Sequence, residues 1–239
     1  MIHLEPVIDF HSHILPEMDD GSTSVEMSIA MLKMQAEQGI THVVATPHFY
    51  PSRDDPMRFL TRRNRSEEKL RREMAKHTDL PQVLMGAEVY YFRGMSLSES
   101  LPLLTIGEKK CIMVETPHCV WDESIYRELW QIRSNLGLTP IVAHIDRYIR
   151  PVRTHRIPER LGQLPVMVQA NAEFFLQKQT AGMAVRMAKA GQIHLLGSDC
   201  HDLSSRKPNL GSALQVLHSR AGDQVIQHIH NCGHNLLEL

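Results

Sequence analysis

The sequence predicts an α/β fold in which about seven parallel strands and the helices between them form a barrel. Short apolar runs alternate with longer helical patterns along all 239 residues, as in right-handed βαβ units. A glycine-rich dinucleotide-binding fingerprint is absent, which favours a barrel over an open sheet. Six of the seven runs end in side chains that can bind metal, where barrel enzymes carry their active sites. No linker or repeat interrupts the pattern, so we expect one domain over residues 1–239.

Seven short apolar runs are the expected strands. They are Val7–Phe10, Thr41–Thr46, Gln82–Glu88, Ile112–Glu115, Thr139–His144, Val166–Asn171 and Ile193–Asp199. Several are almost entirely apolar, which is typical of parallel strands covered on both faces. The expected helices are Ser24–Gln38, Arg58–Lys76, Glu123–Leu136 and Phe174–Ala190, with two amphipathic segments after them.

The first helix has recognisable start and stop signals. Thr23 and Glu26 have the spacing of a capping box, and Gly39 follows the last turn. Apolar residues three or four positions apart give one buried stripe: Val25, Ile29, Leu32 and Ala36.

Composition excludes several classes of function. The net charge of -1 and the absence of a basic cluster give no basis for binding nucleic acid or an anionic membrane. The charged run Arg58–Lys76 contains both signs and indicates a solvated helix face. No apolar stretch is long enough to insert into a membrane. Four scattered cysteines without a CxxC pair indicate reduced thiols, and we expect a cytoplasmic protein.

Histidine and carboxylate side chains gather at the predicted strand ends. His11 and His13 are two apart on a strand, so both side chains point to the same face. Such a pair alone is more often solvated than metal-binding. The other strand ends add His48, Glu88, Glu115, His144, Asp199 and His201. Carboxylates buried together repel one another unless cations neutralise them, so we expect a site for several metal ions.

At this point the chain resembles the polymerase-and-histidinol-phosphatase (PHP) superfamily, and more closely its bacterial capsular-polysaccharide tyrosine-protein phosphatases. The motifs that carry the resemblance are Asp9–His13, Asp19–Gly21, Ala45–His48, Gly86–Glu88, Val114–Glu115, Ala143–Tyr148 and Ser198–His201, in order along nearly the whole chain. The resemblance implies a distorted (β/α)7 TIM-like barrel that binds three divalent ions. Manganese is the expected metal, with iron or zinc as alternatives.

The resemblance also implies a role for each motif residue. His11, His13, Glu88 and Asp199 would hold one ion; Glu88, Glu115 and His144 a second; Asp20, His48 and His201 the third. The residues alone do not select Asp20 over Asp19. Arg147 and Arg206 match the phosphate-binding arginines of the family. The implied partner is a phosphotyrosine protein, with a bacterial tyrosine kinase of capsule or exopolysaccharide synthesis as the expected one, and the resemblance is compatible with a homo-oligomer.

Substrate preference is less certain than the metal ligands. Phe49 and Tyr50 could stack on a tyrosine ring, although packing at the rim is an equal alternative. The segments Phe49–Arg53 and Thr116–Trp121 depart from the family pattern where substrate would enter. A phenolate leaving group, with a pKa of about 10, needs little protonation. The absence of an obvious general acid therefore fits an aryl phosphate.

Three alternatives remain open at this stage. The chain could hydrolyse histidinol phosphate or another small phosphomonoester, or regulate a kinase by binding without turnover. Cys200 and Arg206 have the C-x5-R spacing of cysteine-dependent tyrosine phosphatases. Asp199 precedes this cysteine, however, and a neighbouring carboxylate raises the pKa of a thiol. We therefore favour the metal-dependent mechanism.

Overall fold

Nine short strands form a curled parallel sheet at the centre of the computed structural model, which describes residues 6–149 and 156–239. The strands are β1 (Ile8–Ser12), β2 (His42–Ala45), β3 (His48–Phe49), β4 (Gln82–Met85), β5 (Glu88–Tyr90), β6 (Cys111–Glu115), β7 (Thr139–Val142), β8 (Met167–Asn171) and β9 (Leu195–Gly197). One group pairs in the order β1-β2-β4 and the other in the order β3-β5-β6-β7-β8-β9. The predicted α/β barrel of parallel strands is confirmed.

The first and last strands meet and close the ring. Ser12 pairs with Cys200 in an isolated parallel bridge. The amide of Asp199 donates to the carbonyl of His11 (2.8 Å), and the amide of His13 donates to the carbonyl of Cys200 (2.9 Å). The end of β9 is thereby fixed beside the end of β1, so the residues that follow both strands lie at one rim.

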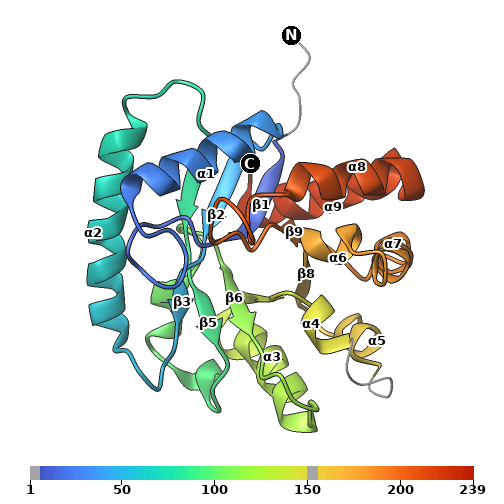
Figure 1. Cartoon of the computed structure of the whole chain (residues 1–239). Helices are drawn as coiled ribbons and strands as arrows, with labels where there is room; N and C mark the ends of the chain where they lie inside the picture. Colours follow the sequence, from blue (N-terminus) through green and yellow to red (C-terminus); the bar gives the residue numbers. More distant parts are fainter. Residues whose placement is uncertain (1–5, 150–155) are drawn as a thin grey trace.

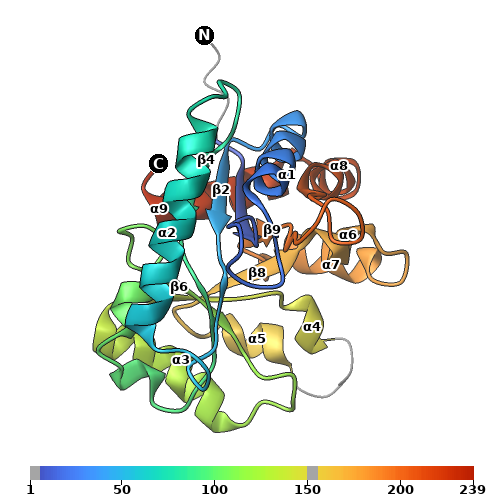
Figure 2. The ribbon, with the colours of Figure 1, turned by 60° about the vertical axis from the view of Figure 1, so that its left-hand side comes forward.

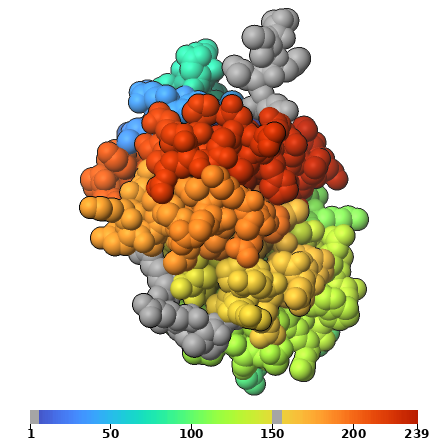
Figure 3. Space-filling view, turned by 90° about the vertical axis from the view of Figure 1, so that its right-hand side faces the viewer, coloured from blue at the N-terminus to red at the C-terminus, as the bar shows by residue number. Residues whose placement is uncertain are grey.

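Helices surround this sheet (Figure 1). The α-helices are α1 (Val25–Glu37), α2 (Pro56–Met74), α3 (Glu123–Leu136), α4 (Asp146–Ile149), α5 (Ile157–Leu161), α6 (Ala172–Leu176), α7 (Ala181–Lys189), α8 (Leu210–Ala221) and α9 (Asp223–Leu237), with 3-10 turns at Met95–Leu97 and Leu101–Leu104. The long helix α2 forms one flank (Figure 2). On another side, α6 and α7 lie beside α8 and α9 (Figure 3). Within the described part of the chain, every helix is too short or too polar to cross a bilayer.

Two apolar clusters hold the strands from both faces. On β6, Cys111 and Met113 belong to one buried cluster, and Ile112 and Val114 belong to a larger one that includes the helix side chains. Alternate residues of a strand point to opposite faces, so this strand is covered on both sides. The apolar run that predicted the strand is explained by this double burial.

Two predicted strands are each interrupted near their carboxyl ends. The predicted strand Thr41–Thr46 stops at Ala45 and resumes as β3, because Pro47 has no amide hydrogen for the ladder. The predicted strand Gln82–Glu88 breaks at the matching position, at Gly86 and Ala87, between β4 and β5. β3 and β5 pair with each other, as β2 and β4 do one step earlier. This distortion places His48 opposite Glu88 in register.

Two details of the predicted helices are wrong. Ser24, not Thr23, caps α1, since the Ser24 hydroxyl accepts a hydrogen bond from the amide of Met27 (3.2 Å). Gly39 does end this helix, with a positive φ of 79°. The predicted helix Phe174–Ala190 is two helices, α6 and α7, separated by a turn in which the Thr180 hydroxyl donates to the carbonyl of Phe174. The prediction of one domain over residues 1–239 stays a prediction.

Candidate metal centre

The side chains predicted to bind metal converge at the carboxyl ends of the strands. The Nε2 atoms of His11 and His13 lie 3.2 Å apart. Glu88, from the start of β5, reaches both with its Oε2 atom, at 3.3 Å from His11 and 3.5 Å from His13. His144 Nε2, after β7, lies 2.7 Å from Glu88 Oε1 and 3.6 Å from Glu115 Oε1. Four strands thus contribute to one buried cluster.

A second set of side chains continues the cluster toward solvent. Asp20 Oδ1 lies 3.4 Å from Nε2 of His48 and 3.4 Å from Nε2 of His201. The rings of His13 and His201 stack with centroids 3.8 Å apart. Asp20 is 65% exposed, whereas the histidines around it are largely buried. The outer part of the site therefore opens to solvent at Asp20.

Among the residues that the structure describes, three groups of side chains have ligand atoms close enough together to hold a metal ion. They are His13, Asp20, His48 and His201; His11, His13 and Glu88; and His48, Glu88 and Glu115. All belong to the predicted ligand set, but His13 and His48 each join two groups, which the family pattern did not suggest. The groups share members, so ions bound in them would be close neighbours.

Several buried atoms in these groups lack a hydrogen-bond partner among the described residues. They include His201 Nε2, and also Glu88 Oε2 and His48 Nδ1, which lie 2.9 Å apart but without the geometry of a hydrogen bond. A buried polar atom without a partner costs about 1–3 kcal/mol, so natural proteins rarely keep several together. Lone pairs on imidazole nitrogen and carboxylate oxygen are the ligands that manganese, iron and zinc accept. The residues present therefore fit a cluster of divalent cations.

Hydrogen bonds to the opposite ring nitrogen fix three of the imidazoles. Nδ1 of His11 donates to Gln169 Oε1 (3.2 Å), and Nδ1 of His13 donates to Asp19 Oδ2 (2.7 Å). Nδ1 of His201 donates to the carbonyl of Asp199 (3.0 Å). Each bond leaves Nε2 unprotonated in the neutral ring and directed at the cluster, as in many metal sites.

Burial and neighbouring charges prepare the site for cations. Burial lowers the pKa of His144 to about 4, and burial with the adjacent His13 lowers the pKa of His201 to about 4. Both rings are neutral at pH 7, which is the form that binds metal. Burial and the Glu88 carboxylate raise the pKa of Glu115 to about 7. This crowding of carboxylates is what a bound cation would relieve.

Two of the predicted ligands occupy strained backbone positions. His144 and Asp199, each two residues after a strand, have positive φ angles of 33° and 52°. Such angles are uncommon outside glycine and persist where surrounding contacts enforce them. The Gln169 side chain accepts from the amide of His144 (2.7 Å), and the His11 carbonyl accepts from the amide of Asp199. These bonds turn both side chains into the rim.

The two predicted arginines approach the cluster from α4, which contains Arg147, and from the loop between β9 and α8, which contains Arg206. Arg147 Nη2 donates to Asp199 Oδ2, and its Nη1 lies 3.6 Å from Glu115 Oε1. Arg206 Nη2 donates to Asp199 Oδ1 (2.9 Å). The Asp199 carboxylate thus receives both guanidinium groups, and a cavity of about 340 Å³ lined by the two arginines borders it.

The structure separates the two predicted substrate-binding aromatic residues. Phe49 is 2% exposed and packs edge-on against Phe59 in the hydrophobic core, with ring centroids 5.2 Å apart. Alternation along β3 sends Phe49 inward, so its predicted contact with substrate is wrong. Tyr50 lies at the rim, with its ring 5.2 Å from that of His48.

A family model described as capsular polysaccharide synthesis, CpsB/CapC, matches residues 7–237. The chain belongs to the CpsB/CapC family. Tyrosine-protein phosphatase YwqE of Bacillus subtilis (strain 168) is 28% identical over 232 residues, which cover 92% of this chain and 87% of YwqE. Tyrosine-protein phosphatase CpsB of Streptococcus pneumoniae is 28% identical over 230 residues, covering 90% and 91%.

Solved structures agree on the fold. The crystal structures of YwqE and CpsB are described as those of unique metal-dependent tyrosine phosphatases. One chain from these crystal structures superposes on this chain with a TM-score of 0.83 at 24% identity. The superposition covers 97% of this chain and 94% of the crystal-structure chain. A histidinol phosphate phosphatase from Lactococcus lactis, complexed with zinc, L-histidinol and phosphate, matches with a TM-score of 0.60 at 14% identity, covering 92% and 93%. At these identities the likeness concerns the fold alone.

The cysteine alternative does not fit this CpsB/CapC chain. Cys200 has no exposed surface, and its thiol contacts the side-chain amide of Gln35. Burial raises the pKa of this thiol well above its ordinary value, and the nearby Asp9 carboxylate raises it further. A protonated thiol beneath the rim cannot act as a nucleophile toward a substrate at the surface.

Sequence reasoning missed the polar residues behind the ligands. Gln169 and Asn171 lie on β8, the strand whose end supplied no predicted ligand. Gln169 Nε2 donates to Asn171 Oδ1 (3.0 Å), and Asn171 Nδ2 donates to Asp199 Oδ2 (2.8 Å). The sequence did contain a signal for them: Gln169 and Asn171 are two polar residues, two positions apart, in an otherwise apolar strand. Asp19, left unresolved against Asp20 by the residues alone, is the partner of His13.

Proposed function

We propose that this chain is a metal-dependent protein-tyrosine phosphatase. One observation carries the proposal: three adjoining groups of imidazole and carboxylate ligands lie beside two arginines that share one carboxylate. Such a site suits hydrolysis of a phosphomonoester, in which positioning and neutralisation of charge do most of the work. Membership of the CpsB/CapC family and the names of its relatives support the tyrosine-phosphate substrate.

The proposed cofactor is a cluster of three divalent ions, with manganese as the expected metal. The proposed ligands are His11, His13, Asp20, His48, Glu88, Glu115, His144, Asp199 and His201. Bound divalent cations would lower the pKa of a coordinated water enough for it to attack phosphorus at neutral pH. Glu88 is the proposed shared ligand, because its two carboxylate oxygens face different histidines.

Arg147 and Arg206 are the proposed phosphoryl-binding residues. Their guanidinium groups present paired N–H donors that match two oxygens of a phosphoryl group. Both now donate to Asp199, so substrate oxygens would replace that carboxylate as acceptors while Asp199 turns to metal. Tyr50, at the rim beside His48, would offer a ring face to the tyrosine of the substrate.

The proposed substrate is a phosphotyrosine protein, and a bacterial tyrosine kinase of capsule or exopolysaccharide synthesis is the proposed partner. The family description names capsular polysaccharide synthesis, which supports this choice. A cytoplasmic location follows from a kinase partner of this kind. The proposed catalytic unit is a single domain over residues 1–239, and self-association remains compatible with it.

Steady-state rates on two substrates test the proposal. Purified protein reconstituted with Mn²⁺ should hydrolyse a phosphotyrosine peptide with a much higher kcat/KM than histidinol phosphate. Chelation should abolish both rates, and added Mn²⁺ should restore them. A preference for histidinol phosphate would replace the substrate assignment. Tight peptide binding without turnover by the Mn²⁺-loaded protein would instead support a regulator that binds the kinase.

A further inference from the structure

A second hollow borders the metal centre at Asp20 and His48, and neither Arg147 nor Arg206 lines it. Its volume is about 450 Å³, within the range of small-molecule binding pockets. We call it the Tyr50 hollow; its charged lining is Asp19, Asp20, Arg53, Asp54 and Arg62, beside Met18, His48 and Tyr50. Because Arg147 and Arg206 line the other cavity, the phosphoryl group has its proposed partners there. The Tyr50 hollow is therefore available to the rest of the substrate.

One wall of this hollow consists of aromatic and cationic side chains that contact one another, starting at the proposed metal ligand His48. The ring of Tyr50 lies 5.2 Å from the ring of His48 and 5.7 Å from that of Tyr90. The guanidinium carbon of Arg53 lies 5.3 Å from the Tyr50 ring centroid. Packing on both sides holds the Tyr50 ring between a proposed ligand and an outer cation.

The charges that line the Tyr50 hollow leave one cation unpaired. Arg62 donates to the carboxylate of Asp54, so these two neutralise each other. Asp19 pairs with His13, and Asp20 faces His48, His201 and Arg206. Arg53 forms no ion pair with any carboxylate of the described residues, and its side chain is exposed. The outer end of the hollow therefore presents a guanidinium that can take a carboxylate from outside.

We propose that the Tyr50 hollow binds the residues next to the phosphotyrosine and that Arg53 selects an acidic side chain among them. This inference rests on the proposed tyrosine-phosphatase function and specifies its substrate: an acidic phosphotyrosine segment. The arginine guanidinium group donates two parallel N–H bonds to a carboxylate. It therefore selects a carboxylate more specifically than a lysine ammonium group, which acts as a point charge. At an exposed rim the gain is modest and weakens with salt.

Paired peptides test the inference. Two phosphotyrosine peptides should differ only in glutamate or glutamine on both sides of the phosphotyrosine. For the Mn²⁺-loaded wild-type protein, we expect kcat/KM to be about two- to five-fold higher for the glutamate peptide at low salt. Arg53→Gln should bring the ratio of the two kcat/KM values close to one, and Arg53→Glu should reverse it.

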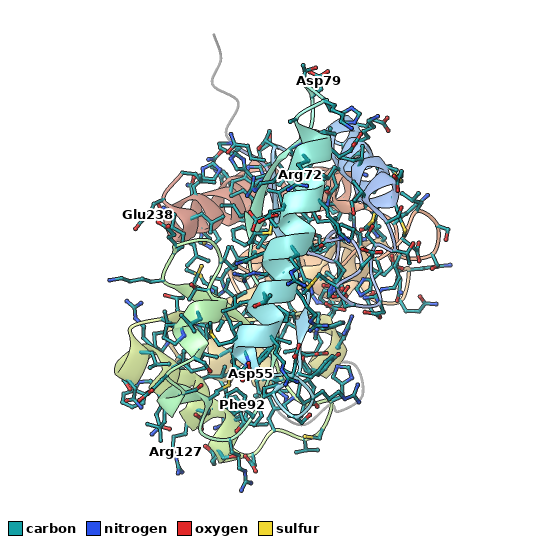
Figure 4. All side chains as sticks on the ribbon, turned by 90° about the vertical axis from the view of Figure 1, so that its left-hand side faces the viewer. Asp55, Arg72, Asp79, Phe92, Arg127 and Glu238 are labelled. Carbon is teal, nitrogen blue, oxygen red and sulfur yellow. The ribbon has the colours of Figure 1, made fainter. Side chains whose placement is uncertain are left out.

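Arg72→Gln is the matched control. It removes one positive charge, as Arg53→Gln does, but Arg72 lies on α2 toward the end opposite Asp55, which directly follows the hollow residue Asp54 (Figure 4). Its ratio should equal that of the wild type. A wild-type ratio of one overturns the inference while leaving the tyrosine-phosphatase function intact, and so does a preference that survives in Arg53→Gln. Failure to hydrolyse either peptide or p-nitrophenyl phosphate would instead refute the proposed function itself.

Discussion

Replacing Gln169 with leucine should both destabilise the protein and weaken its metal binding. Gln169 has no exposed surface, and its Oε1 accepts from the amide of His144 (2.7 Å) and from Nδ1 of His11 (3.2 Å). Leucine leaves these two buried donors without an acceptor. At about 1–3 kcal/mol for each donor, unfolding should require about 2–6 kcal/mol less free energy. Residues that orient metal ligands typically change affinity about 10- to 100-fold, and we expect a loss in that range.

Two measurements separate these effects. Urea unfolding of the metal-free protein gives the change in stability, and titration of the folded, metal-free protein with Mn²⁺ gives the change in affinity. Gln163→Leu makes the same chemical change at an exposed position and should alter neither quantity. The reasoning is refuted if Gln169→Leu binds Mn²⁺ as tightly as Gln163→Leu does.

Three further predictions concern the nucleophile, protons and packing. Cys200→Ser should retain phosphatase activity that chelation abolishes; loss of activity in this variant with its metals still bound would favour the cysteine mechanism. Metal binding should release protons, and its affinity should rise from pH 6 to 8, because two ligands are partly or wholly protonated in this range without metal. Burial and the Glu88 carboxylate raise the pKa of Glu115 to about 7. The Asp19 carboxylate outweighs the effect of burial on His13 and raises the pKa of His13 to about 10. Calorimetry in two buffers of different ionisation enthalpy would detect this release, and heats independent of buffer would contradict it. Gly197→Ala would put a Cβ 2.5 Å from the Cβ of His11, so we expect thermal unfolding to show a loss of about 1–3 kcal/mol; an unchanged Tm would be inconsistent with this packing.

The strand ends were predictable because parallel strands of one barrel end at one rim. Period-two spacing placed His11 and His13 on the same side, and apolar runs located the strands that carry Glu115, His144 and Asp199. Those features depend on local sequence and on a general rule of topology. The structure brings these side chains together as that rule requires.

Other features depend on contacts between distant segments, which periodicity does not encode. Gln169 supports His11 across 158 positions of sequence, and no local pattern relates the two. Asp19 and Asp20 are neighbours in one loop, yet the fold turns one to His13 and the other to His48. Phe49 is buried because its side chain points inward from the short strand β3. That strand exists only because the barrel is distorted. Resemblance to relatives supplied part of this information, but the contacts themselves did not follow from it.

The central claim is that side chains from separate strands jointly bind a cluster of divalent cations, and a metal count tests it most directly. Metal-free protein should be dialysed against Mn²⁺, freed of excess ions and measured by inductively coupled plasma mass spectrometry, with activity on an aryl phosphate followed in parallel. We predict about three ions per chain, the number proposed above, with activity that rises as they bind. About one ion or fewer per chain in fully active protein would contradict the claim.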